Sequence, residues 1–546
     1  MGIYLNPGNE GFQNAVNSEI YIDKTGVIRF INKCLGTEQS CLCVSRPRRF
    51  GKSMAAKMLA AYYSKGCSSG SLFGGLCISR NKDFTLHLNK YNVIYADMND
   101  FLRFAKKQND IVKMTDLFQN EIIEELRSVY PMSVAADAYD LPKTLAKIYI
   151  DTREKFIIII DEWDTLFREA RGNLKAQEYY IDFLRGMFKS PVSAGFLKLA
   201  YLTGILPIKK YNTQSALNNF KEYTMLEPGM LAGYTGFTRK EVKDICSKYN
   251  MDFDEMEYWY DGYSFMVMEE KPDKTVIQKE EHIYNPNSII EAVQRRKCGS
   301  YWTRTESFES LKGYISLNFD GLKDSIIQLL SGNRCTVNTF SFLNDMESFN
   351  DKDDVLTLLV HLGYLAYSPD KKEVYIPNEE IKTEFQAAVK NTGWDTVVKA
   401  VEASDRLLKL TLAGDESSVA SCIGQIHMDN TSILKYNDEN SLSCVITLAY
   451  YNAMNEYVLK RELPAGLGFA DIVFIPKRFS NKPALVIELK ADGTAGGAIK
   501  QIKEKQYIDA LKDYKGNLVL AGINYDKKTK KHECKIEKYV YGGGKA

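Results

Sequence analysis

The sequence lacks an excess of charge of either sign. Its 546 residues contain 71 Lys and Arg against 70 Asp and Glu, which leaves a formal net charge of +1. A positive field over the whole surface is therefore excluded, and any nucleic-acid binding has to come from local patches. Intrinsic disorder is excluded as well, because 45% of the residues are hydrophobic and 12% are aromatic.

Long hydrophobic runs are also missing. The most apolar stretch, Phe156–Ile160, is far shorter than the roughly 20 residues that cross a bilayer. The first residues contain neither a basic segment nor an apolar secretory core, and Asn6 stands where a myristoylation signal needs Ser or Thr. We therefore expect a cytoplasmic protein without membrane contact.

Metal-binding patterns of cysteine and histidine are scarce. The 11 cysteines, an odd number, are scattered without a disulfide framework, which fits a reducing cytoplasm. Cys41 and Cys43 lie close together in an apolar run but lack the further ligands of a zinc site, so a buried strand is the preferred interpretation. The five histidines show no metal-like spacing.

Short apolar runs alternate with helical patterns in the first 230 residues. Runs of this kind are typical of parallel strands buried on both faces, and the alternation predicts an α/β sheet covered by helices. The strands are expected at Cys41–Ser45, Asn92–Asp97, Lys155–Ile160 and Leu197–Thr203, with helices at Met54–Tyr63 and Asp116–Val129 among the intervening segments.

The middle of the chain predicts helices and one small sheet. The charged stretch Glu269–Glu281 is expected to be an exposed loop, and a strand pair after two short helices suggests a winged-helix-like module. The helices are expected at Arg239–Tyr249, Asp324–Leu330 and Asp354–Leu362, and the strand pair at Tyr364–Ser368 and Glu373–Ile376.

The C-terminal part predicts a second α/β domain. A basic tail, Lys527–Lys535, is most simply a solvated charge run, although it could hold phosphates. The expected elements are a helical region from Thr396, a helix at Ile446–Leu459, strands at Phe469–Ile475 and Ala484–Lys490, a helix at Thr494–Leu511 and a strand at Leu518–Ile523.

A phosphate-binding pattern follows the first expected strand. In Arg49-Phe50-Gly51-Lys52-Ser53 the chain turns into a helix, so backbone N–H groups and the helix N-terminus can point at phosphates. Lys52 would neutralise the β- and γ-phosphates and Ser53 would ligate Mg²⁺. The P-loop pattern has glycine where this chain has Arg46, and a helix cap alone explains many Gly-Lys-Ser tripeptides.

An acidic pair ends the most apolar strand. Asp161 would hold Mg²⁺ and Glu162 would act as the general base for the attacking water, as in P-loop enzymes. The alternative is a buried strand that ends in a solvated acidic loop. The P-loop pattern about a hundred residues upstream favours the nucleotide site. Thr203, before Gly204, is a candidate sensor of the γ-phosphate, or simply a strand end.

A second acidic constellation lies near the C-terminus. Glu488 and Lys490 share one face of a strand, and a hairpin can bring Asp471 beside them. Two carboxylates would bind Mg²⁺, and the lysine would orient or activate water for attack on a phosphodiester. Gln501 and Tyr507 on the next helix are accessory candidates. Exposed charges at a strand end are the simpler alternative.

These motifs resemble those of bacterial predicted AAA-ATPase-like proteins that end in a PD-(D/E)XK nuclease-superfamily domain. The family uses Arg-Pro-Arg-Arg-Phe-Gly-Lys in place of a glycine-led loop, so Arg46 fits it. Other matching stretches are Tyr21–Thr25, Arg46–Ser53, Asp161–Asp164, Thr203-Gly204, Leu217–Asn219, Trp259–Tyr263, Tyr284–Pro286, Ile376–Asn378, Gly466–Asp471, Ile487–Lys490 and Gln501–Tyr507.

The resemblance implies an ATPase coupled to a Mg²⁺-dependent nuclease. ATP, Mg²⁺ and nucleic acid, most simply DNA, are the implied ligands, and assembly into a homo-oligomer stays open. The family usually has an acidic residue near Ala465 and an arginine near Phe469, and this sequence has neither. A nucleotide-dependent binding switch with an inactive nuclease-like domain is therefore the alternative. The expected domains are a P-loop NTPase at 1–235, a helical lid-like region at 236–306, a winged-helix-like module at 307–400 and a nuclease-like domain at 401–546.

Overall fold

The chain forms two compact units in the computed structural model. The first comprises Met1–Ser307 and Thr336–Glu384, and the second comprises Phe308–Cys335 and Phe385–Ala546. Residues 307–400, expected as one module, are thus divided between the two units. The structure describes residues 2–211, 214–270, 276–302, 307–317, 319–330, 332–390, 404, 406–430, 446–447, 449–450, 453, 457–465, 468–476, 482–505 and 517–539.

A five-stranded parallel sheet forms the centre of the first unit. Its strand order is β2-β3-β4-β1-β7, so β1 and the next strand in the chain, β2, are separated by two others. The four predicted strands are confirmed, with ends that differ by at most one residue. Their bounds are β1 Cys41–Ser45, β2 Asn92–Asp97, β3 Phe156–Asp161, β4 Leu197–Gly204 and β7 Lys221–Tyr223.

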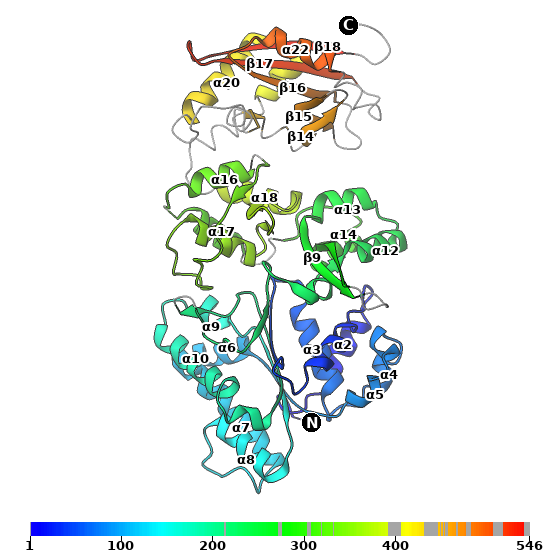
Figure 1. Cartoon of the computed structure of the whole chain (residues 1–546), viewed down its shortest axis with the longest axis vertical. Helices are drawn as coiled ribbons and strands as arrows, with labels where there is room; N and C mark the ends of the chain where they lie inside the picture. Colours follow the sequence, from blue (N-terminus) through cyan, green and yellow to red (C-terminus); the bar gives the residue numbers. More distant parts are fainter. Residues whose placement is uncertain are drawn as a thin grey trace. The chain divides into compact units, whose positions relative to one another are not determined.

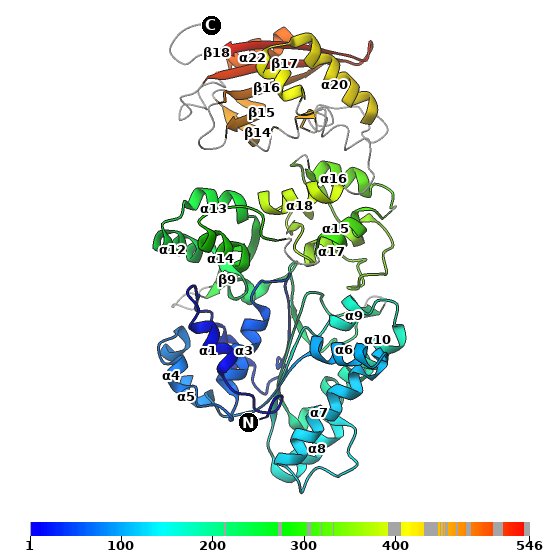
Figure 2. The ribbon, with the colours of Figure 1, turned by 180° about the vertical axis from the view of Figure 1, so that it is seen from behind.

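Helices cover both faces of this sheet (Figures 1 and 2). Leu42 and Val44 of β1 pack into the core beneath α2 and α3, and Ile157 of β3 joins them. One face carries α1 (Glu10–Val16), α2 (Val27–Cys34), α3 (Lys52–Tyr63), α4 (Gly70–Phe73) and α5 (Phe84–His87). The other carries α6 (Met98–Lys107), α7 (Met114–Val129), α8 (Leu141–Thr152), α9 (Thr165–Glu169) and α10 (Leu174–Phe188). The α/β fold predicted from the alternating pattern is therefore correct.

Short elements connect the main ones in the first unit. They are the 3-10 helices η1 (Cys77–Arg80), η2 (Ile111–Lys113) and η3 (Gly229–Tyr234), the helix α11 (Ser193–Phe196) and the strands β5 (Lys210–Tyr211) and β6 (Gln214–Ser215).

The predicted loop at Glu269–Glu281 is wrong. Most of it belongs to an antiparallel hairpin of β9 and β10. The pairing runs from the pair Tyr263–Ile283 to the pair Glu270–Val276. An antiparallel ribbon needs only one covered face, so charged residues do not prevent strand formation. The surrounding elements are β8 (Phe237–Thr238), α12 (Arg239–Tyr249), α13 (Phe253–Tyr260), β9 (Tyr263–Glu270), β10 (Val276–Tyr284) and α14 (Pro286–Arg295).

Local capping explains where two of these helices begin. Thr238 and Glu241 form a reciprocal capping box at α12. Asn285 caps α14 by accepting from the backbone N–H groups of Asn287 and Ser288, and Pro286 occupies the first turn. The unit is completed by α17 (Lys352–His361) and the antiparallel pair β12 (Ala366–Ser368) and β13 (Glu373–Tyr375), close to the predicted helix and strand pair.

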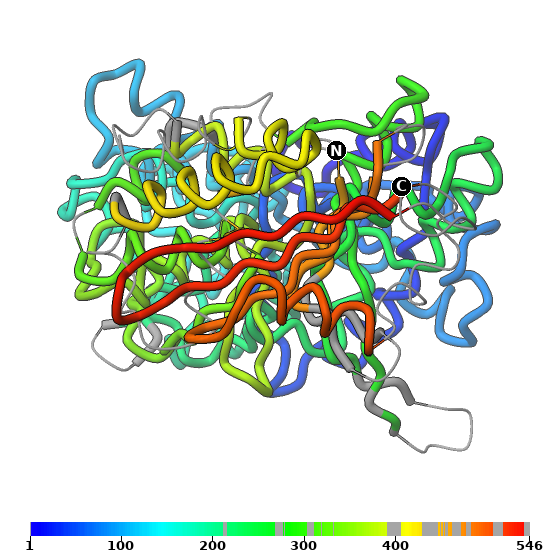
Figure 3. Tube along the Cα trace, turned by 90° about the horizontal axis from the view of Figure 1, so that it is seen from above, coloured from blue at the N-terminus to red at the C-terminus, as the bar shows by residue number. Residues whose placement is uncertain are grey.

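The second unit contains a mixed five-stranded sheet in the order β14-β15-β16-β17-β18. Only β16 and β17 are parallel, and α22 connects them. In Figure 3, β17 and β18 are the neighbouring red tubes, with α20 beside them in yellow. The bounds are β14 Tyr457–Ala465, β15 Gly468–Pro476, β16 Ala484–Ala491, α22 Ala495–Glu504, β17 Leu518–Asp526 and β18 Lys531–Tyr539. Further helices are α15 (Ser307–Ile315), α16 (Leu322–Leu330) and α20 (Glu416–Asn430). Two elements contain residues of both units, namely α18 (Glu379–Lys390) and β11 (Cys335–Thr336).

Two predictions about the second unit need correction. The helix expected at Ile446–Leu459 ends too late, because Tyr457 already pairs with Pro476 in the sheet. The basic tail contains the start of an edge strand, in which Cys534 is buried while Lys531 and Lys535 are exposed. Lysines on the open side of an edge strand are a common protection against further pairing.

Candidate nucleotide and metal sites

The loop between β1 and α3 has the backbone geometry of an anion site. Arg49 and Gly51 adopt positive φ angles of 66° and 86°. The second of these is readily adopted only by glycine, and such turns direct successive N–H groups toward one point. Lys52 is the first residue of the twelve-residue helix α3, so its N-terminal dipole adds to the effect. Phe50 is buried and packs edge-on against Tyr263.

Arg46, which replaces the expected glycine, is fully buried at the start of this loop. Its Nη1 donates to the carbonyl oxygens of Ser45 and Tyr223 at 2.8 and 2.9 Å, and its guanidinium lies 5.6 Å from the ring centre of Phe265. Burial lowers the pKa of Arg46 to about 10. The side chain therefore fastens the phosphate loop to β7 and the β9–β10 hairpin.

The carboxyl ends of β3 and β4 bring two predicted residues together. Thr203 Oγ1 donates to Asp161 Oδ1, and both side chains are buried. Burial raises the pKa of Asp161, although hydrogen bonds from Ser53 and Thr203 oppose that shift. The contact with Ser53 links β3 to the first turn of α3. Hydroxyl and carboxylate oxygens are ligands that Mg²⁺ prefers, so Ser53 and Asp161 fit this metal.

Glu162 lies between two buried cations. Its Oε1 is 3.8 Å from Lys52 Nζ, and its Oε2 accepts from Arg168 Nη2. Burial alone would raise the pKa of Glu162, but Lys52 and Arg168 together lower it. Lys52 also donates to the carbonyl oxygen of Pro47 at 3.0 Å, and burial lowers its pKa. Glu162 is therefore a carboxylate, and Lys52 reaches the mouth of the phosphate loop.

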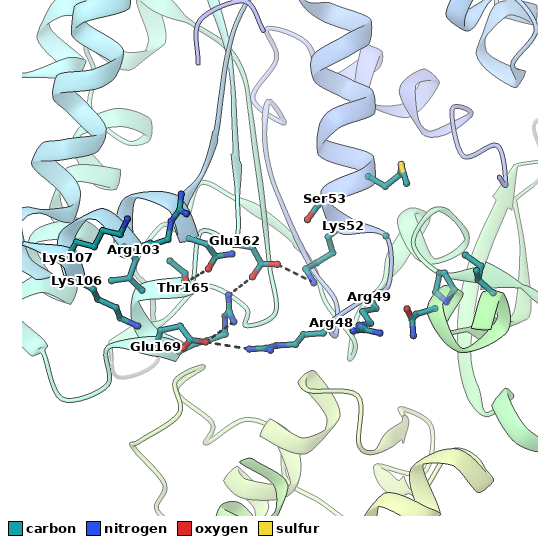
Figure 4. A pocket seen from close by; sticks show the side chains of 18 residues that line it. Arg48, Arg49, Lys52, Ser53, Arg103, Lys106, Lys107, Glu162, Thr165 and Glu169 are labelled. Carbon is teal, nitrogen blue, oxygen red and sulfur yellow. Dashed lines mark hydrogen bonds and ion pairs between the residues drawn. The ribbon is translucent and has the colours of Figure 1, made fainter. Parts of the chain in front are cut away.

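A cavity of about 1050 Å³ opens above these residues. Figure 4 shows the phosphate-loop side chains on one side and cations of α6 on the other, with Glu162 between them. The sequence analysis missed the α6 cations and Arg168. The signal for the former was available, because α6 follows β2, whose carboxyl end lies at the same sheet edge as Asp161. The missed cations are Arg103, Lys106, Lys107 and Arg168.

The lining of the cavity suits a polyphosphate. Arg48 bridges to Glu169 at 3.5 Å, and Arg168 is held by Asp164 at 3.1 Å, so these two cations are already balanced. Arg49, Lys106 and Lys107 have no ion pair among the described residues. These uncompensated cations, together with the N-terminus of α3, favour a negatively charged ligand.

The second candidate site lies on adjacent strands of the C-terminal sheet. Ile472 of β15 pairs with Ile487 of β16, so Asp471 and Glu488 are neighbours one residue further along. Asp471 Oδ2 accepts from the N–H of Leu489 at 2.8 Å. The structure thus brings the two predicted carboxylates to one place on the sheet.

Glu488 is the central side chain of this site and is only 1% exposed. Its Oε1 accepts from Gln501 Nε2 and from Lys490 Nζ, the latter at 3.3 Å, while no donor among the described residues reaches Oε2. Burial, aided by Asp471, raises the pKa of Glu488 to about 7. A buried carboxylate oxygen without a donor, beside a second carboxylate, fits a divalent cation.

The helix α22 brings Gln501 to the site. It packs closely on β17 at Gly522, where a Cβ atom would lie 2.3 Å from the carbonyl oxygen of Ala495. Tyr507 lies outside the described residues. Ala465 and Phe469 lie in β14 and β15, respectively. The described residues contain no group of three or more His, Cys, Asp and Glu that could hold a metal.

Comparison with known proteins identifies both parts of the chain. Residues 8–213 match the family model described as predicted AAA-ATPase, and residues 437–535 match that of the PD-(D/E)XK nuclease superfamily. An uncharacterized protein in the vnfD 5′ region of Azotobacter chroococcum mcd 1 is 21% identical over 539 residues, which are 93% of each chain.

Two solved structures show remote similarity. The Aeropyrum pernix ORC2 protein, solved as ADPNP-ADP complexes, is 12% identical, with a TM-score of 0.30 over 68% of this chain and 98% of its own. AMPPCP-bound DnaA from Aquifex aeolicus is 10% identical, with a TM-score of 0.19 over 44% of this chain and 56% of its own.

No described helix has the length and apolar character for crossing a bilayer. The chain joins an N-terminal region that matches the predicted AAA-ATPase model to a C-terminal region that matches the PD-(D/E)XK nuclease-superfamily model, the architecture that its sequence motifs indicate.

Proposed function

We propose that the first unit binds and hydrolyses ATP with Mg²⁺, and that the second cleaves phosphodiester bonds of nucleic acid, most simply DNA. The observation that carries the first half is the meeting of Lys52 and Glu162 below a cationic cavity at the carboxyl edge of a parallel sheet. Ligands of open α/β sheets bind at this edge, where the strand order reverses, and β1 lies at that reversal.

The side chains have distinct tasks in hydrolysis. Lys52 and the N–H groups of Arg49–Ser53 bind the phosphates, while Ser53 and Asp161 would hold Mg²⁺, which would supply further charge neutralisation. Glu162 accepts the proton of a water whose oxygen bonds to the γ-phosphorus as the bond to ADP breaks. Thr203, hydrogen-bonded to Asp161, senses the γ-phosphate through that carboxylate.

The substitution Lys52→Ala tests the nucleotide site. Loss of a charge-assisted contact to phosphate should weaken ATP binding by about 1.5–3 kcal/mol, or roughly 10- to 150-fold. Isothermal titration calorimetry with ATP and Mg²⁺ measures this change. Lys57→Ala, on the exposed side of the same helix, is the matched control and should bind like the wild type. An unchanged affinity of Lys52→Ala would refute the nucleotide site.

Cleavage in the second unit rests on Asp471, Glu488 and Lys490. The two carboxylates would hold Mg²⁺, and the metal would supply Lewis-acid activation of water and charge stabilisation at the phosphate. Lys490, 3.3 Å from Glu488, orients the water and adds positive charge. Gln501 fixes Glu488 by its hydrogen bond.

A nucleotide-dependent binding switch is the second candidate function. It is favoured by the occupation of Glu488 Oε1 by Lys490 and Gln501, and by the lack of a third acidic or histidine ligand among the described residues. In such a switch the second unit holds nucleic acid or protein without cutting it.

A plasmid-nicking assay with Mg²⁺ or Mn²⁺ separates these functions. We expect the wild type to nick and Glu488→Ala to lose at least about 99% of the rate, since removal of one metal ligand costs roughly 3 kcal/mol or more of transition-state stabilisation. Glu504→Ala, an exposed carboxylate on α22, is the control and should keep full activity. If the wild type cuts no faster than Glu488→Ala, the switch is the correct function.

A further inference from the structure

A second cationic cavity lies in the first unit and shares no residue with the nucleotide cavity. Two adjoining hollows of about 350 and 630 Å³ both include Arg29 and Lys33 of α2 in their walls. Arg80 and Lys82 from the end of η1 complete the larger hollow. We call these four cations and the two hollows the basic cleft.

The basic cleft carries charge that the protein itself does not balance. The side chains of its four cations are exposed and make no ion pair or hydrogen bond with another described residue. Lys279, which also lines the cleft, is paired with Glu281 at 3.1 Å. Counting Asp83 as well, the lining has three positive charges in excess, against +1 for the whole chain.

This arrangement costs stability unless an anion binds. Arg29 and Lys33 are four residues apart on α2, so they lie on one helix face and repel each other by about 0.2–0.5 kcal/mol. Arg80 and Lys82 add further repulsion from the opposite wall. A ligand with several negative charges removes this cost.

The cleft is built by a motif that neither proposed reaction uses. Asp23 Oδ2 accepts from the N–H of Cys77 at 2.6 Å, and the buried Thr25 Oγ1 accepts from the N–H of Ile78 at 3.2 Å. Both contacts fasten the segment before α2 to η1. They therefore hold the wall with Arg29 and Lys33 against the wall with Arg80.

Lys24, which lies between Asp23 and Thr25, fixes the other side of the cleft. Lys24 Nζ donates to the carbonyl oxygen of Gly233, which lines the smaller hollow, at 2.8 Å, and to Glu241 at 2.6 Å. Three consecutive side chains thus connect α2 with η1, η3 and α12. These hydrogen bonds give each residue of the Asp23-Lys24-Thr25 motif a structural role.

We propose that the basic cleft binds the sugar–phosphate backbone of a nucleic-acid strand. Exposed cations spread over several elements suit a chain of phosphates, whereas a site for one free phosphate encloses its ligand with buried donors. The inference extends the proposed function, because the ATPase unit then contacts nucleic acid directly. Binding needs neither hydrolysis nor cleavage, so it is measured independently of both.

Charge reversal within the cleft tests the proposal in the full-length protein. Fluorescence anisotropy with a labelled oligonucleotide, in EDTA and without nucleotide, gives the affinity over a series of KCl concentrations. Lys33→Glu with Arg80→Glu should weaken binding about tenfold or more, and the slope of log affinity against log salt should fall by about 2, one for each lost phosphate contact. The matched control, Lys175→Glu with Lys240→Glu, reverses two exposed and unpaired lysines elsewhere and should change neither value.

Two further measurements decide between the ligands and guard against misfolding. Arg29→Gln with Lys82→Gln, which adds no negative charge, should reduce affinity in the same direction, and all variants should have a thermal midpoint no lower than that of the wild type and the same ATP affinity. Oligonucleotide binding equal to the wild type in both cleft variants overturns the proposal. The proposal is also overturned if the cleft variants lose binding of inorganic pyrophosphate but keep their affinity for the oligonucleotide, because the ligand is then a free phosphate compound.

Discussion

Buried charged side chains mark both candidate sites at the scale of single residues. Lys52, Glu162 and Arg168 form a chain of ions beneath the nucleotide cavity, and Glu488 lies almost fully covered in the other unit. Transfer of a charge out of water costs several kcal/mol unless partners compensate it. Hydrophobic residues would fill these positions at lower cost, so the charges point to ligand chemistry.

The pKa of Glu488 gives a prediction about metal binding. With a value of about 7, this carboxyl group is mostly protonated at pH 6 and mostly ionised at pH 8. A divalent cation must displace its proton, so we expect Mn²⁺ affinity to rise about tenfold per pH unit below 7 and to level off above it. Isothermal titration calorimetry of the full chain with Mn²⁺ measures this.

A charge-neutral variant provides the control for that titration. Glu488→Gln removes the titrating group, so its weak residual Mn²⁺ binding should not show the rise that ends near pH 7. A wild-type affinity that is no higher than that of Glu488→Gln at pH 8 would show that Glu488 does not hold the metal.

The predictions for whole elements were most accurate where strands are covered on both faces. β1 and β3 consist of apolar residues up to Ser45 and Asp161 at their carboxyl ends, and every residue of each strand is buried. Such runs are visible in a sequence, and because parallel strands end at the same sheet edge, Asp161 and Thr203 could be assigned to one site in advance. The meeting of Asp471 and Glu488 was predicted differently, from a hairpin that brings two antiparallel strands side by side.

Elements with one open face were harder to predict. The strands β10 and β18 carry exposed charged residues, and β14 begins inside a pattern that equally suits a helix. Arg168 was missed for another reason. Its part in the site depends on the packing of α9 at the sheet edge, which the spacing of residues along the chain does not encode.

At the scale of the whole molecule, the two units are connected by more than one passage of the chain. The chain passes between them three times, after Ser307, Cys335 and Glu384. A single linker leaves two domains largely independent, whereas several connections make a change in one unit harder to confine to it. The third connection runs through α18, whose residue Glu380 is buried and accepts from Ser288 of α14.

This connection reaches the nucleotide cavity, because Pro286 and Asn287 at the start of α14 line it. A nucleotide bound there would alter the surroundings of α14 directly, and the hydrogen bond from Ser288 to Glu380 would pass a shift of α14 on to α18. We therefore expect ATP binding, rather than its hydrolysis, to control the second unit. Hydrolysis then limits how long the controlled state lasts.

Glu162→Gln distinguishes binding from hydrolysis in this coupling. The substitution leaves Lys52 and the phosphate loop in place but removes the proton acceptor, so ATP should bind and persist. In a nicking time course with limiting ATP, we expect at least about a threefold stimulation of the wild type, roughly 0.7 kcal/mol in barrier height, that ends as ATP is consumed. Glu162→Gln should stay stimulated, and Lys52→Ala should not respond. If Glu162→Gln instead loses the stimulation while it still binds ATP, hydrolysis itself drives the second unit, and the path through α14 and α18 acts only during turnover.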